Sequence, residues 1–410
     1  MPIKKVLMLL CLLALLAGCR PAPDGTVTLI WATNSHPSRV DAARWFEKQH
    51  PGVRVEIMPM GDARQFFLKC LYGDAPDVIT FFSADTFQAF AENGLLRPLS
   101  GPSRHAWPYY DALQAYCFKG KTDELMALPQ VAYPYVLYFN PDLVPKDKAM
   151  AVRTWGDLLT IIRTLSPAVT DTGKPVFGLD IQNESVWFTT WYWQRGGRFF
   201  SEEGTSVLDR DIARDTLAAM ACWRSLPGVI PKPSDRLNLP SSGASQGVLG
   251  SLFLQGRALF YWSGSWKIGD FEAQDRVPWQ VRMLPCGPIN DVTVMGGNSF
   301  GVSGRSSHPE LARQFVAALG GKAAQKRHLA HRIYLPARKE IPVPQSLSIL
   351  KDQAQKARCP EHSPLLNEAL VKEIFKQALE AHRLGVADAQ EAADMMASAL
   401  EAGAVEVACD

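Results

Sequence analysis

Apolar and polar positions alternate along the first hundred residues as expected for strands that are each followed by a helix. Residues 27–31 form an apolar run, residues 39–49 carry an amphipathic repeat, and residues 53–57 alternate with period two. The same succession returns at 77–82, a buried-strand pattern, and at 85–93, a helical one. Strands that alternate with helices in this way predict an α/β fold.

The later chain continues without internal repeats or long charge blocks. Residues 227–247 are rich in Pro, Ser and Gly, which indicates a long surface loop. Residues 387–402 are Ala-rich and strongly helical in pattern.

The first eighteen residues read as a targeting segment. Lys4 and Lys5 precede an apolar run over residues 6–16, which falls short of the roughly 20 residues that cross a bilayer. We therefore interpret residues 1–18 as a signal peptide, with a transmembrane anchor as the alternative. The chain is expected to be exported to the periplasm or the cell surface.

The end of this segment, Leu16-Ala17-Gly18-Cys19, resembles the lipobox of bacterial lipoproteins. The resemblance implies cleavage before Cys19 and a lipid on its thiol, which would attach the protein to a membrane. Residues 19–25 are rich in Pro and Gly and suit a short lipidated tether.

Composition excludes some partners and favours others. A chain of 410 residues exceeds the usual size of one core, so two lobes are expected. The 43 Lys+Arg nearly balance the 41 Asp+Glu, so no nucleic-acid partner is indicated. The 11 Trp are more than core filling requires, and Trp suits sites where flat apolar area meets a polar ligand.

Six cysteines remain after the signal peptide and Cys19 are set aside: Cys70, Cys117, Cys222, Cys286, Cys359 and Cys409. In an exported protein they can pair as disulfides or stay as buried thiols, and the sequence leaves both open. Their spacing is not that of a zinc site, so we expect no metal, and nothing indicates a cofactor.

Several short segments together carry a family resemblance. They are residues 46–48, 51, 53–55, 73–78, 94–96, 137–143, 154–158, 255–258, 264–266, 307–312 and 315–316. In this order and spacing they resemble the extracellular solute-binding proteins of the maltose/maltodextrin type, over nearly the whole mature chain.

The resemblance implies a two-lobed, periplasmic-binding-protein-like α/β fold with hinge-crossing strands and a ligand between the lobes. The crossings fall near residues 130–135, 295–299 and 334–338. The implied division is 26–131 plus 296–336 for lobe I and 132–295 plus 337–410 for lobe II.

A sugar site needs flat aromatic platforms bordered by carboxylates, amides and guanidinium groups. The resemblance places Trp266 and Trp187 at aromatic positions of the family, with Trp191 close by. In lobe I, Phe82 and Asp85 align with an aromatic and a carboxylate of the family. Each has a structural alternative: the Trp residues can be core, and Asp85 can be a helix N-cap.

Further candidates lie at strand ends and crossings: Trp31, Asn34, Ser35, Tyr133, Gly297, Asn298 and Arg338. The first three follow from the rule that open α/β sheets bind ligands at the carboxyl ends of their strands. Tyr133 can instead pack in the hinge, and the Gly-Gly pair before Asn298 can instead be a turn with positive φ.

The sequence thus predicts the solute-binding subunit of an ABC importer, a monomer that captures a sugar or oligosaccharide and delivers it to the permease subunits. One alternative is a different solute, such as a glycerol phosphate ester, for which Arg39, Arg64 or Arg338 offer charge. A carbohydrate-active enzyme is disfavoured because no catalytic motif is present. A purely structural lipoprotein is disfavoured by the crossing pattern.

Overall fold

The structure is a computed structural model that describes residues 25–73, 75–166, 168–170, 173–181, 183–201, 204–236, 251–274, 277–333, 335–359 and 368–407. The signal peptide, Cys19, residues 237–247 of the predicted loop, and Tyr334 lie outside these residues.

The described strands are β1 (Val27–Thr33), β2 (Val53–Pro59), β3 (Val78–Phe81), β4 (Leu96–Arg97), β5 (Ala127–Phe139), β6 (Ala168–Val169), β7 (Pro175–Ile181), β8 (Ala258–Gly264), β9 (Gln280–Arg282), β10 (Thr293–Ser303) and β11 (Ala357–Arg358). They form one sheet in the order β2-β1-β3-β10-β5-β8-β7-β6, with β4 and β11 paired to β10 and β9 paired to β5.

The described α-helices are α2 (Pro37–Gln49), α3 (Ala63–Tyr72), α4 (Ala84–Glu92), α5 (Lys146–Ala151), α6 (Trp155–Leu165), α7 (Glu184–Gln194), α8 (Arg210–Ser225), α9 (Ser251–Leu254), α10 (Lys267–Gln274), α11 (Pro309–Gly320), α12 (Lys322–Arg327), α13 (Ile349–Gln355), α14 (Glu368–Arg383) and α15 (Ala389–Val407). Short 3₁₀ helices are η1 (Asp111–Tyr116), η2 (Pro233–Arg236), η4 (His328–His331) and η5 (Gln345–Leu347).

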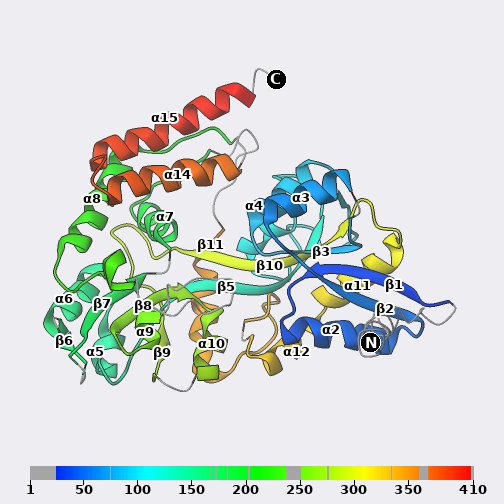
Figure 1. Cartoon of the computed structure of the whole chain (residues 1–410), viewed down its shortest axis with the longest axis horizontal. Coiled ribbons are helices and arrows are strands. Elements are labelled where there is room, and N and C mark those ends of the chain that lie inside the picture. Colours follow the sequence, from blue (N-terminus) through cyan, green and yellow to red (C-terminus); the bar gives the residue numbers. More distant parts are fainter. Residues whose placement is uncertain are drawn as a thin grey trace, which may run out of the picture.

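Two groups of elements lie at opposite ends of the molecule and share the two longest strands (Figure 1). At one end β1 pairs in parallel with β2 and β3, and at the other β7 pairs in parallel with β8. Between them β10 runs antiparallel to both β3 and β5, and β5 runs antiparallel to β8. The α/β fold class is therefore confirmed, and β5 and β10 are shared by both ends.

The described core consists of three apolar clusters. One fills the β7–β8 end, and the one that contains Trp31 extends from β1 as far as Tyr138, Tyr261 and Phe271 of β5, β8 and α10. Side chains of α6, α7, α8, α14 and α15 pack on the β7–β8 end, which we call lobe II. Trp31, Phe46 and Phe315 belong to the cluster beneath β1 and β10 at the other end, which we call lobe I. In Figure 1, α14 and α15 lie beside α7 and α8 although they come last in the chain.

The predicted limits between the lobes stay a prediction. The described residues after the third crossing contribute to both lobes. Leu350 and Ala354 of α13 pack in the cluster of lobe I that contains Leu113. Later in the chain, α14 and α15 pack in lobe II.

Local sequence explains where the helices of lobe II begin. Thr154 and Asp157 form a reciprocal capping box at α6, and Asn183 accepts hydrogen bonds from two backbone N–H groups at the start of α7. Ends fixed in this way orient the Trp-rich face of α7 toward the core.

Candidate ligand-binding site at the crossing strands

Three segments pass between the lobes side by side. β5 and β10 pair antiparallel from Met295–Pro134 to Gly301–Ala127. The third segment follows η4, where Ala132 N donates to Leu335 O at 3.0 Å and Ala337 N donates to Gln130 O at 3.1 Å. Two of the predicted crossings coincide with β5 and β10, and the described part of the third, residues 335–338, lies against β5.

Gly297 lies inside β10 rather than in a turn. Its φ is not positive, so the turn alternative for this glycine is wrong. A Cβ at this position would meet Leu113 Cδ2 at 2.5 Å and the backbone oxygen of Val131 at 3.1 Å. Glycine is therefore required here by the close approach of η1 and β5 to the strand.

Trp266 lies directly after β8 and meets two tyrosines of β5. Its ring contacts Tyr133 edge to face, with centroids 5.8 Å apart at 84°, and Tyr135 at 5.1 Å and 88°. Trp266 and Tyr133 are both only partly buried, and the indole Nε1 of Trp266 has no hydrogen-bond partner. These rings form an aromatic corner at the crossing, and its partly exposed rings suit a ligand that offers apolar C–H faces.

The glycine two residues before Trp266 leaves room for this ring. A Cβ on Gly264 would lie 1.7 Å from Cζ3 of Trp266. The Gly-Ser-Trp order of the sequence is therefore a steric requirement for the ring position.

Lobe I presents polar groups at the ends of its first strands. Asn34 and Ser35 are exposed between β1 and α2, and Asn34 Oδ1 accepts from His36 N at 3.2 Å. Phe82 follows β3 and is 42% exposed. The positions of Asn34 and Ser35 agree with the strand-end rule used on the sequence, whereas Phe82 was a candidate from the family resemblance.

Asp85 lies in the first turn of α4, and Ser83 occupies the N-cap position. Asp85 is therefore not the N-cap residue of α4, and the cap alternative is wrong. A carboxylate in the first turn still interacts favourably with the helix dipole. Burial raises the pKa of Tyr116 well above its usual range, and the nearby charges of Cys359 and Asp85 add to the shift. Asp85 thus lies near η1, which also borders Gly297.

Two other lobe I candidates make structural contacts. Trp31 is 0% exposed, its Nε1 donates to Thr80 Oγ1 at 2.9 Å, and its ring packs on Phe300 and Phe315. Arg338 donates to the Gly320 oxygen and to Glu340 at 3.2 and 3.0 Å. Ligand contact by Trp31 or Arg338 stays a prediction, and these contacts give each a structural reason of its own.

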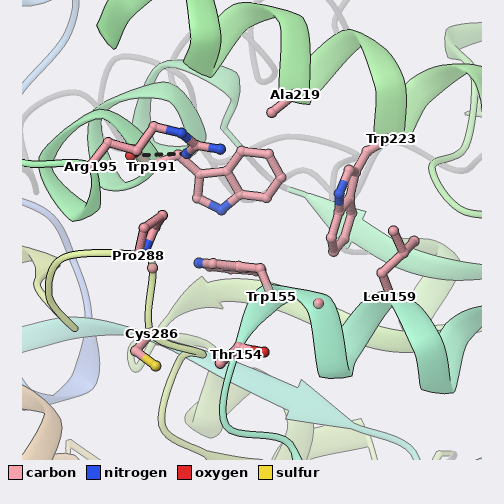
Figure 2. A pocket seen from close by; sticks show the side chains of 11 residues that line it. Thr154, Trp155, Leu159, Trp191, Arg195, Ala219, Trp223, Cys286 and Pro288 are labelled. Carbon is pink, nitrogen blue, oxygen red and sulfur yellow. Dashed lines mark hydrogen bonds between the residues drawn. The ribbon is translucent and has the colours of Figure 1, made fainter.

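Trp187 and Trp191 lie on α7 within lobe II. They are 1% and 2% exposed, and their rings meet edge to face at 5.1 Å. Trp191 borders a cavity of about 290 Å³ that is also lined by Trp155 and Trp223 (Figure 2). All residues that line this cavity belong to lobe II, so it is distinct from the aromatic corner at the crossing.

Two further polar contacts join segments outside the crossing strands. Lys121 Nζ of lobe I donates to the Ser201 oxygen of lobe II at 3.3 Å. Arg332, beyond η4, lies 3.6 Å from Glu272 of α10.

Sequence reasoning missed a buried polar cluster at the crossing. Asn298 is 7% exposed, and in the amide orientation that satisfies both of its groups its oxygen accepts from Arg39 Nη2 at 3.0 Å. Arg39 also donates to Gln130 Oε1, whose Nε2 lies 2.8 Å from His328 Nε2. The signal available was an Arg in the first turn of an amphipathic helix, on the face that should be apolar.

The ionisation of this cluster is consistent with its contacts. Burial lowers the pKa of His328 to about 3, with the charge of Arg39 adding to the shift, so the ring is neutral and can accept from Gln130. Burial also lowers the pKa of Arg39 to about 10, which still leaves it protonated at neutral pH.

Among the described residues, no group of three or more His, Cys, Asp or Glu side chains could hold a metal ion. Cys70, Cys117, Cys222 and Cys286 form no disulfide among the described residues, and the alternative of buried thiols is confirmed for Cys70 and Cys117 but is wrong for Cys222, which is exposed. No helix in the described part of the chain has both the length and the apolarity needed to span a bilayer.

Two α/β lobes joined by crossing strands, with partly exposed aromatic rings where they meet, define the class of two-lobed binding proteins. A family profile described as bacterial extracellular solute-binding protein matches residues 36–326, and the chain belongs to this family. The family is one of exported binding proteins that serve ABC importers, and the predicted membership is confirmed.

The similarity of this chain to known proteins extends over nearly its whole length. A galactooligosaccharide-binding protein of Bacillus subtilis (strain 168) is 26% identical over 93% of this chain and 92% of its own. The maltose/maltodextrin-binding domain MalE of Bdellovibrio bacteriovorus, solved with maltotriose, superposes with a TM-score of 0.74 at 18% identity, covering 94% of this chain and 100% of that one. The GacH receptor of Streptomyces glaucescens, solved without ligand and with acarbose, gives 0.75 at 20% identity over 93% and 99%. These structural similarities confirm the two-lobed fold.

Proposed function

We propose that this protein captures a sugar or oligosaccharide between its lobes and passes it to the permease of an ABC importer. The observation that carries the proposal is the corner of Trp266, Tyr133 and Tyr135 at the crossing. The named ligands of its relatives, a galactooligosaccharide, maltotriose and acarbose, are all carbohydrates and support the same class.

The proposed ligand contacts combine the aromatic corner with polar groups of lobe I. Trp266 and Tyr133 offer faces and edges for the sugar ring, and Asn34, Ser35 and Asp85 offer partners for its hydroxyls. Phe82 adds a second exposed ring on the side of lobe I.

A phosphate ester is less well supported by the same structure. Arg39 is buried and engaged with the two crossing strands, and Arg338 is engaged with Gly320 and Glu340. Neither guanidinium is therefore available for a bidentate contact with phosphate without breaking existing hydrogen bonds.

A thermal-shift screen tests the ligand class. We expect maltotriose or a galactooligosaccharide to raise the melting temperature, since a ligand at 100 times its Kd stabilises by about 2.7 kcal/mol. Glycerophosphodiesters serve as the comparison series. Stabilisation by a glycerophosphodiester and by none of the sugars would contradict the sugar proposal and indicate a phosphate ester as the ligand.

We expect the ligand to close the lobes without being altered, because hinge bending brings the two sides of a binding site together. The measurement is small-angle scattering with and without the sugar, in which the radius of gyration should fall. Chromatography of the recovered sugar is the second readout, and turnover by the pure protein would replace a binding function with an enzymatic one.

Lipid attachment at Cys19 is the third part of the proposal and rests on Leu16-Ala17-Gly18-Cys19. We expect mass spectrometry of the mature protein to show residue 19 as a diacylglycerol-modified N-terminus. The matched variant Cys19→Ser should appear in the soluble fraction. An intact segment of residues 1–18, or an unmodified Cys19, would contradict it.

A further inference from the structure

Arg39 contacts both long crossing strands from the core of lobe I. It is 3% exposed, donates to Gln130 Oε1 on β5, and donates through Nη2 to Asn298 on β10 at 3.0 Å. Its guanidinium also lies over the rings of Trp31 and Phe300, at 5.9 and 5.3 Å from their centroids. One side chain of α2 therefore binds the two strands that join the lobes.

The contact falls where the pairing of these strands is irregular. Asn298 pairs with Val131 but Ser299 pairs with Pro129, so Gln130 is the extra residue of a β-bulge. A bulged residue has no ladder partner to hold it, and here its side chain is held by Arg39 on one side and His328 on the other. The backbone oxygen of Gln130 accepts from Ala337, so the third crossing segment meets the same point.

The hydrogen-bond partners of Arg39 at the crossing are uncharged. No carboxylate in the described part of the chain forms an ion pair with Arg39, so its partners are the two amides and the aromatic faces. A buried cation is costly unless hydrogen bonds satisfy it, which ties the position of Arg39 to that of the two strands.

Beyond the cluster, toward lobe II, the paired strands contain one proline and two glycines. Met295 pairs with Pro134, which has no N–H to donate, and the next two positions of β10 are Gly296 and Gly297. Glycine has the widest backbone freedom, so this stretch resists bending least.

We propose that Arg39 is a positioning residue that ends the rigid body of lobe I at Gln130 and Asn298 and confines hinge bending to residues 132–135 and 295–297. The aromatic corner lies on this bending stretch, because Tyr133 faces Gly296 in the register. Arg39 thereby determines where the two halves of the proposed site pivot, without touching the ligand.

Lobe II contains a matched control. Arg282 is 6% exposed, donates to the backbone oxygens of Ala149 and Val152, and has a pKa that burial lowers to about 10, as for Arg39. Its bonds stay within lobe II. Arg282→Gln therefore removes an equally buried guanidinium without touching the crossing.

The test compares Arg39→Gln with Arg282→Gln by hydrogen exchange of the ligand-free proteins. In Arg39→Gln we expect peptides over residues 127–132 and 297–301 to exchange about tenfold faster or more, while peptides of β1 and β2 keep their wild-type rates. Scattering of the same protein should give a larger radius of gyration. In Arg282→Gln the faster exchange should be confined to lobe II.

Two further variants keep the test decisive. Arg39→Lys retains the charge but not the fork that reaches both strands, and Asn298→Ala removes only the β10 partner; each should accelerate exchange at 297–301. Wild-type protection of both crossing peptides in these variants, or a uniform rise throughout lobe I, would overturn the proposal. Because no ligand is used, failure to bind sugar does not affect the outcome.

Discussion

Replacing Trp266 with Ala is expected to weaken binding of the sugar at least about tenfold while leaving the fold intact. Truncating a central aromatic anchor commonly costs about 2 kcal/mol or more, and each 1.4 kcal/mol is a factor of ten in affinity. The ring is partly exposed and rests edge-on against Tyr133 and Tyr135, so its loss opens the site more than it opens the core.

Titration calorimetry on the Trp266→Ala protein, with the melting temperature recorded alongside, measures both effects. Trp266→Phe is the graded control, because a smaller flat ring retains part of the contact and should lose less affinity. If Trp266→Ala binds the sugar with wild-type affinity but has a much lower melting temperature, the ring belongs to the core and the site lies elsewhere.

Replacing Trp191 with Ala is expected to have the opposite profile. This ring is 2% exposed and packs edge to face on Trp155, Trp187 and Trp223, with centroids 5.1 to 5.2 Å away. Deleting a core indole of this kind costs about 3–5 kcal/mol, so the free energy of unfolding should fall by that amount.

Denaturant unfolding measures the loss, and calorimetry on the protein that remains folded should return the wild-type affinity. A clear loss of affinity with little loss of stability would make Trp191 a ligand contact, as its place beside Trp187 in the sequence suggested. The two Trp variants thus distinguish a ligand platform from a core residue within one lobe.

Much of the fold was predictable because its signals are local. Period-two and helical patterns located β1, α2 and β2 to within two residues, and α15 was found from its Ala-rich repeat. The neighbouring α14 was not predicted from the sequence. No local pattern indicates that β10 lies between β3 and β5, and the family resemblance predicted crossing strands but not their order in the sheet.

The candidate site was predictable in outline but not in the orientation of its side chains. Trp266 and Trp187 are equally aromatic in sequence, yet the first is partly exposed at the crossing and the second is 1% exposed. The difference arises because α7 is packed on nearly every side within lobe II whereas Trp266 lies at the crossing, and that is a tertiary property. Arg39 was considered only for phosphate, because its partners Gln130 and Asn298 are far away in sequence.

The position of β10 has a consequence for how the protein is made. β3 has β10 as its partner on one side, and Phe81 pairs with Ser299, more than half of the chain later. At roughly 5–20 residues per second, synthesis leaves that edge of β3 unpaired for on the order of 10–40 s. Pairing over such separations is also slow to form. The sheet of lobe I is therefore completed only after most of the chain has been synthesised.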